Sequence, residues 1–243
     1  MDDRETFRQE AAASALRLGK DAELQRLARD VIAQSDRHHW SYQWTWLGVP
    51  IIQMPPDIVA TQEIIWKTKP QIIIETGVAR GGSLILYASI LELLGEGKVI
   101  GVDVEIRAHN RASIESHPLS KRIELIESDA LSPTLHEALK EKTKNVERVM
   151  VILDSNHTHE HVLQELKDYG TMASVGSYCV VFDTFVEDMP PKYFPDRPWD
   201  KGNSPKTAVH EFVSEDDRFV IDRAIDQKLL ITVAPSGYLK RVK

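Results

Sequence analysis

The sequence predicts an α/β protein of the Rossmann-like type, with a seven-stranded mostly parallel sheet, helices on both faces and an antiparallel last strand. Three observations carry this prediction. From residue 70 onward, short continuous apolar runs alternate with helical segments, a pattern typical of strands covered on both faces. A glycine-containing turn joins the first of these runs to a helix. Near the end of the chain, the turn Ser236–Gly237 precedes a short strand candidate over 238–242, which indicates a hairpin and a reversed closing strand.

The composition is that of an ordinary globular domain and excludes several classes of protein. The chain has 243 residues, of which 42% are hydrophobic and 28% charged, which fits one α/β domain with additions or at most two small domains. The net charge of −7 argues against a nucleic-acid partner. The single cysteine, Cys179, excludes an internal disulfide framework and a cysteine-rich zinc site. The N-terminus lacks the apolar core of a signal peptide, and no apolar run approaches the roughly 18 residues of a membrane span. We therefore expect a cytoplasmic protein.

Residues 1–69 are expected to form a helical and aromatic segment that packs on a domain of residues 70–243. Two helices are predicted in this segment, over 4–35 with a break at Gly19, and over 58–67 with Asp57 as the N-cap. Between them lies the aromatic stretch 38–46. Residues 40–46 of this stretch, together with Tyr193, Phe194 and Trp199, are expected either to wall a substrate pocket, or to pack the segment onto the core or form an oligomer interface.

The domain of residues 70–243 contains five predicted apolar strands in alternation with helices. The strands are 71–75, 98–103, 123–129, 148–154 and 177–183, and the helices between them are 83–94, 109–117, 134–142 and 158–169. A long loop, 186–204, leads to a helix over 206–214, with Ser204 as N-cap and Pro205 as the first helical residue. Residues 219–223 and 229–234 are further strand candidates before the closing strand.

Three of these strands end in a carboxylate, namely Glu75, Asp103 and Asp154. Ligands of open α/β sheets bind at the carboxyl ends of the strands, near the point where the strand order reverses. Several acids gathered at that edge destabilise one another unless a cation or polar ligand lies among them. Alternatively, each acid is only a helix cap or a loop residue, but the consistent placement at strand ends favours a ligand site.

The turn after the first strand reads Glu75-x-Gly77-x-x-x-Gly81-Gly82-Ser83. Its spacing is wider than that of the dinucleotide fingerprint, and the preceding acid disfavours a phosphate. S-adenosylmethionine fits, because its methionyl end carries an ammonium group and Asp103 is placed to bind the ribose hydroxyls. Ser128 and Asp129 are placed for the adenine edge. The predicted cofactor-binding residues are Glu75, Gly77, Gly81, Gly82, Ser83, Asp103, Ser128, Asp129 and Asp154.

A second group consists of Asp154, His157 and Asp183. Asp154 and Asp183 end neighbouring predicted strands, and two carboxylates with water suit a hard divalent cation. His157 follows Asp154 by three residues and is the predicted catalytic base for a substrate hydroxyl held by that cation. The alternative for His157 is a solvent-exposed residue in the first turn of a helix. A zinc site of His157, His159 and His161 is a weaker alternative, because these residues do not share one helical face.

Over residues 38–240 the chain resembles the cephalosporin hydroxylase family, which is related to macrocin-type and rhamnosyl O-methyltransferases. The stretches that carry the likeness are Trp46–Pro50 with Gln53 and Pro55, Ile74–Gly77 with Gly81–Ser83, Gly101–Asp103, Leu153–His157, His161–Val162 with Glu165–Leu166, Val181–Thr184 and Gly202–Pro205. No single motif is specific, but the ordered series is.

The resemblance implies a class I methyltransferase fold, S-adenosylmethionine, a divalent metal (usually Mg²⁺) and methyl transfer to a hydroxyl group. It implies that Asp154 and Asp183 hold the metal and that His157 acts as base. Phe182 departs from the pattern, because the macrocin-type relatives carry a glutamate there as a further metal ligand; Asn156 or water could replace it.

The expected acceptor is a hydroxylated small molecule, such as a natural product or a glycoside, and the relatives imply a homo-oligomer. Two alternatives to this function are kept. One is a cofactor-binding protein that assists an oxygenase, which Phe182 suggests. The other is a nicotinamide dehydrogenase, which the missing dinucleotide fingerprint disfavours.

Overall fold

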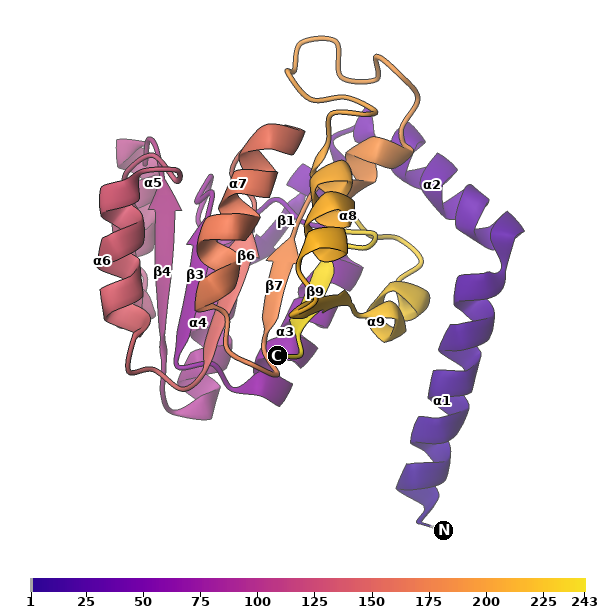
Figure 1. Cartoon of the computed structure of the whole chain (residues 1–243), viewed down its shortest axis with the longest axis horizontal. Helices are drawn as coiled ribbons and strands as arrows, with labels where there is room; N and C mark the ends of the chain where they lie inside the picture. Colours follow the sequence, from indigo (N-terminus) through magenta and orange to yellow (C-terminus); the bar gives the residue numbers. More distant parts are fainter. Residues whose placement is uncertain (1) are drawn as a thin grey trace.

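A seven-stranded sheet forms the centre of the protein in the computed structural model, which describes residues 2–243 (Figure 1). The strands lie in the order β5-β4-β3-β6-β7-β9-β8. Their bounds are β3 (Ile72–Thr76), β4 (Lys98–Asp103), β5 (Ile123–Glu127), β6 (Val149–Leu153), β7 (Tyr178–Val181), β8 (Phe219–Ile221) and β9 (Tyr238–Arg241). The neighbouring strands β5, β4, β3, β6 and β7 pair in parallel. In contrast, β9 is antiparallel to both β7 and β8. The predicted fold class, including the reversed last strand, is confirmed.

The order of the strands reverses between β3 and β6. From β3 the chain extends the sheet through β4 to β5, and from β6 it extends the other way through β7. The connections that leave β3 and β6 therefore diverge at the carboxyl edge and leave a crevice between them. Thr76 and Leu153 are paired in register, so the loops that begin at Gly77 and Asp154 start side by side.

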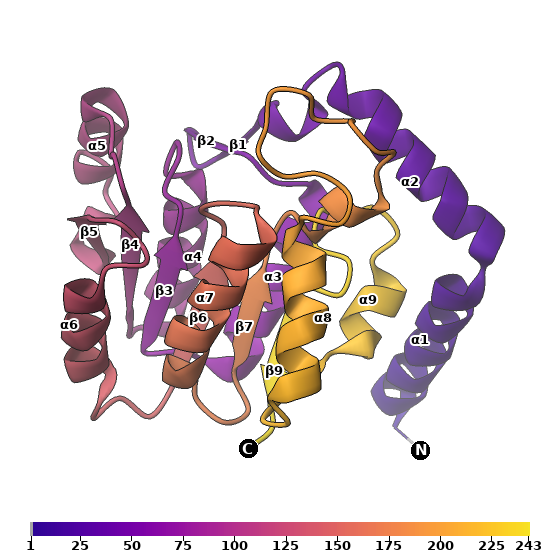
Figure 2. The same ribbon diagram turned by 45° about the horizontal axis from the view of Figure 1, so that its top comes forward.

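Helices cover both faces of the sheet (Figures 1 and 2). One layer contains α3 (Pro55–Thr68), α4 (Gly82–Leu94), α5 (Ala108–Glu115) and α9 (Arg223–Lys228), and the other contains α6 (Pro133–Thr143), α7 (His159–Tyr169) and α8 (Pro205–Glu215). Each layer encloses its own apolar core, with Leu84 and Leu91 in the first and Leu166 and Phe212 in the second. The central strands are mainly apolar because both of their faces are covered, with Glu75 and Thr76 of β3 as buried polar exceptions.

The N-terminal helices α1 (Asp3–Lys20) and α2 (Ala22–Asp36) form an arm along one side of the domain (Figures 1 and 2). α1 contacts the body through α9, while α2 contributes Ile32 to the first core and accepts a hydrogen bond from Tyr193 Oη at the Ala33 carbonyl oxygen. The break between the helices is at Asp21, whose side chain caps α2 by accepting a hydrogen bond from the Leu24 amide, not at the predicted Gly19. Gly19 lies in the last turn of α1, where the missing side chain leaves space for Gln227.

The aromatic stretch forms the short helix η1 (Trp40–Tyr42) and a hairpin of β1 (Trp44–Trp46) and β2 (Val49–Ile51), which the sequence pattern did not predict. Trp44 and Trp46 pack partly buried against the first core, and the Trp46 indole donates to Ser89 of α4 at 3.0 Å. The tryptophans therefore fasten the N-terminal segment to the domain. The proposed division at residues 69 and 70 stays a prediction.

Two local predictions in this layer are wrong, and both concern residues that are hydrogen-bonded to each other in the structure. Asp57 is not an N-cap, because α3 begins two residues earlier, at Pro55. Its fully buried carboxylate instead accepts hydrogen bonds from Thr232 Oγ1, Val233 N and Tyr238 Oη. Residues 229–234 are not a strand, and within them the Thr232 hydroxyl and the Val233 amide donate to Asp57 instead. By contrast, Ser204 and Pro205 begin α8 as predicted, with a capping box to Thr207.

No helix within residues 2–243 combines the length and the apolar composition required to cross a bilayer.

Candidate functional site

The loop after β3 is held in a conformation that only glycine adopts easily. Gly77 and Gly81 have φ angles of 90° and 87°, in the left-handed region that favours glycine. A Cβ on Gly77 would lie 2.1 Å from the Asp154 carbonyl oxygen, and one on Gly82 would lie 2.3 Å from the Pro50 carbonyl oxygen. The loop therefore lies in backbone contact with the end of β6 and with the β1–β2 hairpin.

Replacing Gly77 by alanine should reduce the free energy of unfolding by about 3 kcal/mol or more, because the positive φ and the clash with Asp154 both oppose the native loop. Gly95→Ala is the matched control. Gly95 has a φ of 84°, but a Cβ at this position would meet nothing within 4 Å, so it should show only the conformational cost of about 1–2 kcal/mol. Urea unfolding of both variants measures the difference, and equal losses would contradict the close approach of the two loops.

Asp103 lies at the end of β4 and contacts the same loop. Its Oδ2 accepts hydrogen bonds from the amides of Val78 at 2.8 Å and Ala79 at 3.3 Å. The Ser128 amide donates to the Asp103 carbonyl oxygen at 2.9 Å, which brings the ends of β4 and β5 together. Asp129 follows, exposed, at the turn after β5. The structure thus places the predicted ribose and adenine residues in sequence along one edge.

Glu75 is placed differently from an acid that faces a ligand. It is fully buried, and its two carboxylate oxygens accept hydrogen bonds from Ser83 Oγ at 2.7 Å and Tyr87 Oη at 2.9 Å. Tyr87 was not among the predicted site residues, although its position four residues after Ser83 places both on one face of α4. Any contact between Glu75 and a cofactor in this arrangement is indirect.

Burial raises the pKa of Glu75 to about 8 from an ordinary 4.5, against the opposing effect of its two hydrogen bonds. Its stabilising contribution is therefore complete below about pH 4.5 and is lost as the pH rises through 8. Glu75→Gln should remove this loss, so its free energy of unfolding relative to wild type should increase by roughly 3–4 kcal/mol between about pH 5 and pH 8. Urea unfolding across this range measures it, and parallel curves for the two proteins would contradict the prediction.

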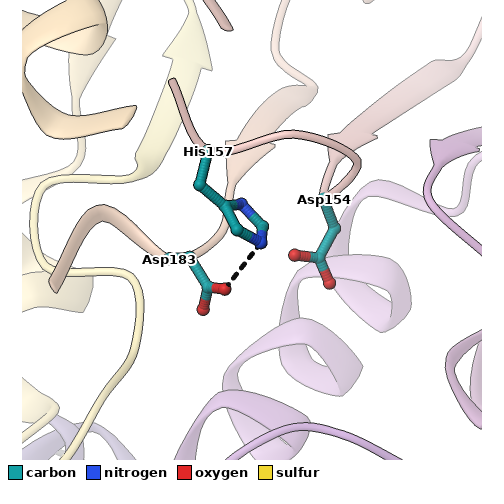
Figure 3. A group of neighbouring side chains, drawn as sticks. All are labelled: Asp154, His157 and Asp183. Atoms are coloured by element: carbon teal, nitrogen blue, oxygen red, sulfur yellow. Dashed lines mark ion pairs between the residues drawn. The ribbon is translucent and has the colours of Figure 1, made fainter. Parts of the chain in front are cut away.

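Asp154, His157 and Asp183 converge beside this loop (Figure 3). Asp154 follows β6, Asp183 follows β7, and His157 lies on the loop before α7. One potential ligand atom of each residue lies within 4.8 Å of those of the other two. His157 Nε2 is 3.0 Å from Asp183 Oδ2, and the imidazole is only 14% exposed. His157 is thus not a solvent-exposed residue of a helical first turn.

The electrostatics of this group fit a divalent cation. Burial, followed by the charge of Asp183, raises the pKa of Asp154 well above its ordinary range. Burial also raises the pKa of Asp183, although the charge of His157 opposes the shift. Two partly buried carboxylates supply hard oxygen ligands, and a cation between them would relieve their repulsion while His157 stays free as the base. The residues therefore fit the predicted metal.

Neighbouring side chains limit what else could hold that metal. Phe182 is 1% exposed and belongs to the apolar core, so this position offers no ligand. Asn156 Oδ1 accepts hydrogen bonds from both Thr158 N and Thr158 Oγ1, so it is engaged in the turn before α7 and does not replace a glutamate. Of the two replacements considered for the missing glutamate, Asn156 and water, this leaves water.

The three-histidine alternative is not supported by the structure. His159 contacts Thr207 and Glu211 of α8, whereas His161 contacts Ser155 and Glu165. Only His157 faces Asp154 and Asp183.

A cleft of ≈ 480 Å³ opens above these residues. Its lining includes Asp154, His157 and Asp183, and on the outer side Asp36, His39, Tyr42, Phe194, Arg197 and Trp199. The Trp199 ring meets His157 edge-on, with centroids 4.6 Å apart, and carries the Arg197 guanidinium 5.2 Å from its centroid. Both interpretations of the aromatic residues therefore hold in part: Tyr42, Phe194 and Trp199 line the cleft, while Trp44 and Trp46 pack on the core.

A second, smaller cavity of ≈ 40 Å³ lies under residues 77–83. Ile52, Gln53, Ala79 and Asp154 line both this cavity and the cleft. The glycine loop and the group of Asp154, His157 and Asp183 therefore belong to one continuous site at the reversal of the strand order.

A parallel sheet with a reversed last strand, a glycine loop after β3 and carboxylates after β4, β6 and β7 define a protein with the class I methyltransferase fold. The chain belongs to the Rhamnosyl O-methyltransferase/CmcI family, whose model matches residues 38–242. The predicted family and the predicted O-methyltransferase class are thereby confirmed. Neither the oxygenase-assisting protein nor the nicotinamide dehydrogenase is favoured.

Individual relatives agree with this assignment. The chain is 28% identical over 223 residues to a rhamnosyl O-methyltransferase of Mycobacterium leprae (strain TN), covering 87% of this chain and 91% of that protein. It is 29% identical over 224 residues to that of Mycobacterium tuberculosis (strain H37Rv), covering 87% and 86%.

Two solved structures share the fold. The structure named "cmcI-D160 Mg-SAM" has a TM-score of 0.59 at 20% identity, over 83% of this chain and 78% of that one. The MycE methyltransferase in complex with Mg, SAH and Mycinamycin VI has a TM-score of 0.55 at 14% identity, over 87% of this chain and 54% of that one.

Proposed function

We propose that the protein transfers the methyl group of S-adenosylmethionine to a hydroxyl of a small-molecule natural product or glycoside, with the assistance of Mg²⁺. The observation that carries the proposal is the position of Asp154. It lines both the cavity under the glycine loop and the cleft that holds His157 and Asp183. A donor on the loop and an acceptor in the cleft would therefore meet beside Asp154.

The names of similar proteins support each part of this proposal. The curated relatives are rhamnosyl O-methyltransferases, and the two structural neighbours are named as complexes with Mg and SAM, or with Mg, SAH and Mycinamycin VI. The residues of this chain suit the same groups, since glycines permit close approach of a cofactor and Asp154 and Asp183 offer oxygen ligands.

The transfer forms an oxygen–carbon bond to the acceptor as the carbon–sulfur bond of the sulfonium breaks, which leaves S-adenosylhomocysteine. The acceptor proton moves to His157, and Asp183 Oδ2, 3.0 Å from His157 Nε2, stabilises the imidazolium. Trp199 holds the imidazole edge-on and thereby limits its rotation. Alignment of donor and acceptor contributes about 7–11 kcal/mol, and the base contributes roughly 10²–10⁴-fold in rate. A magnesium ion, when bound, lowers the pKa of the acceptor hydroxyl.

The cleft wall fits a hydroxylated ring system. Tyr42, Phe194 and Trp199 offer aromatic faces, which pack against sugar rings and flat polyketides. Asp36 and Arg197 add one hydrogen-bond acceptor and one group of donors at the same wall. This composition supports a glycosidic or polycyclic acceptor over a purely aliphatic alcohol.

We also propose a cytoplasmic homo-oligomer without a nucleic-acid partner. The net charge of −7 supports the last point. The arm of α1 and α2 supports the oligomer, because Phe7, Leu16, Leu27 and Val31 are 70%, 41%, 45% and 46% exposed, and a second copy would cover them. Light scattering after size-exclusion chromatography should give a mass above that of one chain, and a monomer at all concentrations would exclude the oligomer.

Calorimetry with S-adenosylmethionine, S-adenosylhomocysteine and NAD tests the cofactor. We expect the first two to bind and NAD not to bind; binding of NAD alone would overturn the function. Transfer of a labelled methyl group to a panel of alcohols and glycosides, with and without Mg²⁺, then tests the chemistry. Cofactor binding without transfer to any acceptor would instead favour the oxygenase-assisting protein.

A further inference from the structure

Gln53 lies on the loop between β2 and α3, directly between the two parts of the site. It is 2% exposed and lines both the cavity under the glycine loop and the cleft. Its Oε1 is buried and has no hydrogen-bond partner. Among the side chains of residues 2–243 with such an atom, Gln53 is the one found in the lining of both. A buried amide oxygen without a partner costs roughly 1–3 kcal/mol, which a ligand donor would recover.

A chain of hydrogen bonds connects Gln53 to the acid at the end of β3. Gln53 Nε2 donates to Tyr87 Oη at 3.4 Å, and Tyr87 Oη donates to Glu75 Oε1 at 2.9 Å. Burial and the nearby Glu75 raise the pKa of Tyr87 well above its ordinary value, so the phenol keeps its proton and remains a donor.

The direction of this chain decides which atom of Gln53 faces the site. Because the Tyr87 proton is directed to Glu75, the Tyr87 oxygen must accept, and the Gln53 amide nitrogen is the group that faces it. Oε1 is left to accept a hydrogen bond from a ligand. Each bond polarises the next toward Glu75, which makes Oε1 a better acceptor for a cationic donor.

We propose that Gln53 Oε1 binds the ammonium group of the methionyl part of S-adenosylmethionine, and that Tyr87 and Glu75 orient Gln53 for this contact. The inference rests on the proposed function and assigns one group of its cofactor to one residue. It gives the buried Glu75 a role in cofactor binding, although both of its carboxylate oxygens are hydrogen-bonded to Ser83 and Tyr87. Glu75 orients Tyr87, and through it Gln53, without contacting the ammonium itself.

Charge favours an ammonium over a neutral donor at this position. Asp154 lines the cavity beside Gln53, and Asp103 contacts the amides of Val78 and Ala79 in the same loop. These two acids favour a cation, while Arg80, which also lines the cavity, suits the carboxylate of the same methionyl group. An acceptor hydroxyl in the cleft is the competing donor, and the choice of ligands below separates the two.

The test measures, by calorimetry, the affinity of wild type and Gln53→Met for three probes. S-adenosylhomocysteine carries an ammonium and a carboxylate, its decarboxylated analogue carries the ammonium alone, and 5′-methylthioadenosine carries neither. Methionine matches the shape of glutamine and removes both polar atoms. We expect Gln53→Met to weaken the first two probes by about tenfold to a hundredfold and to leave the affinity for 5′-methylthioadenosine unchanged.

Two further variants complete the design. Thr61→Val is the matched control, because it removes a buried hydroxyl of α3 that also has no partner but lies outside the lining of the cavity and the cleft. This variant should bind all three probes as wild type does. Tyr87→Phe breaks the chain behind Gln53 and should weaken only the two ammonium probes, by less than Gln53→Met. If Gln53→Met does not fold, Tyr87→Phe alone tests the contact.

Equal loss of affinity for all three probes would overturn the contact, since it would indicate a general disturbance of the site. Unchanged binding of S-adenosylhomocysteine to Gln53→Met would overturn it as well, while leaving the proposed function intact. If wild type bound none of the three probes, the proposed function and this inference would both be wrong.

Discussion

Replacement of His157 by alanine should lower kcat/KM for methyl transfer by about 10²–10⁴-fold. His157 Nε2 is the nitrogen that faces Asp154 and Asp183 in the cleft, so the variant loses the group that accepts the hydroxyl proton. The affinity for S-adenosylhomocysteine should stay within about twofold, because His157 lies outside the lining of the glycine-loop cavity. Single-turnover transfer of a labelled methyl group separates the two effects.

His159→Ala is the matched control for this experiment. His159 lies two residues further along, but its side chain contacts Thr207 and Glu211 on α8. Its rate of transfer should remain close to that of wild type. If His157→Ala methylated the acceptor at the wild-type rate, the assignment of the base would be wrong, whatever the result for the control.

Asp154→Asn should have the second large effect, a loss of roughly 10²–10³ in kcat/KM, because it removes one of the two carboxylates of the metal site. The same change should stabilise the protein without metal, since burial and the charge of Asp183 raise the pKa of Asp154 and thus oppose its ionised form. Activity and stability are therefore expected to change in opposite directions.

Thermal unfolding of wild type and Asp154→Asn, each with EDTA and with saturating Mg²⁺, measures both effects. We expect Mg²⁺ to raise the Tm of wild type by mass action and to leave the Tm of the variant nearly unchanged. Asp217→Asn makes the same substitution at an exposed position paired with Lys243 and should respond to Mg²⁺ as wild type does. A full Mg²⁺ response by Asp154→Asn would contradict its role as a ligand.

Most of the sheet could be predicted because its signals are local. Strands such as 71–75 and 148–154 are continuous apolar runs, and a run of this length between turns indicates a strand covered on both faces. The group of Asp154, His157 and Asp183 was predictable for a related reason. Carboxyl ends of parallel strands meet at one edge, so acids at those ends approach one another even when they are distant in sequence.

The parts that could not be predicted depend on partners far along the chain. Asp57 resembles an N-cap from its neighbours, yet Thr232, separated from it by 175 residues, and Tyr238, separated by 181, decide its role. The residues at 229–234 have apolar character but turn toward Asp57 instead of joining the sheet. The hairpin of β1 and β2 is held by packing of Trp46 on α4, which no local pattern indicates.

The sequence by itself determined the class of fold, the edge at which the site lies, and the acids and histidine that gather there, because strand periodicity and strand ends are properties of short segments. Only the tertiary structure decided which of these groups is enclosed in the core and which lines the cavity. Glu75 is enclosed by α4 and bonded to Ser83 and Tyr87, while Gln53, brought in by the N-terminal segment, lines the cavity in its place. The physical reason is that the burial of a side chain and the direction of its hydrogen bond depend on which two segments pack together. The sequence of one segment does not contain that information.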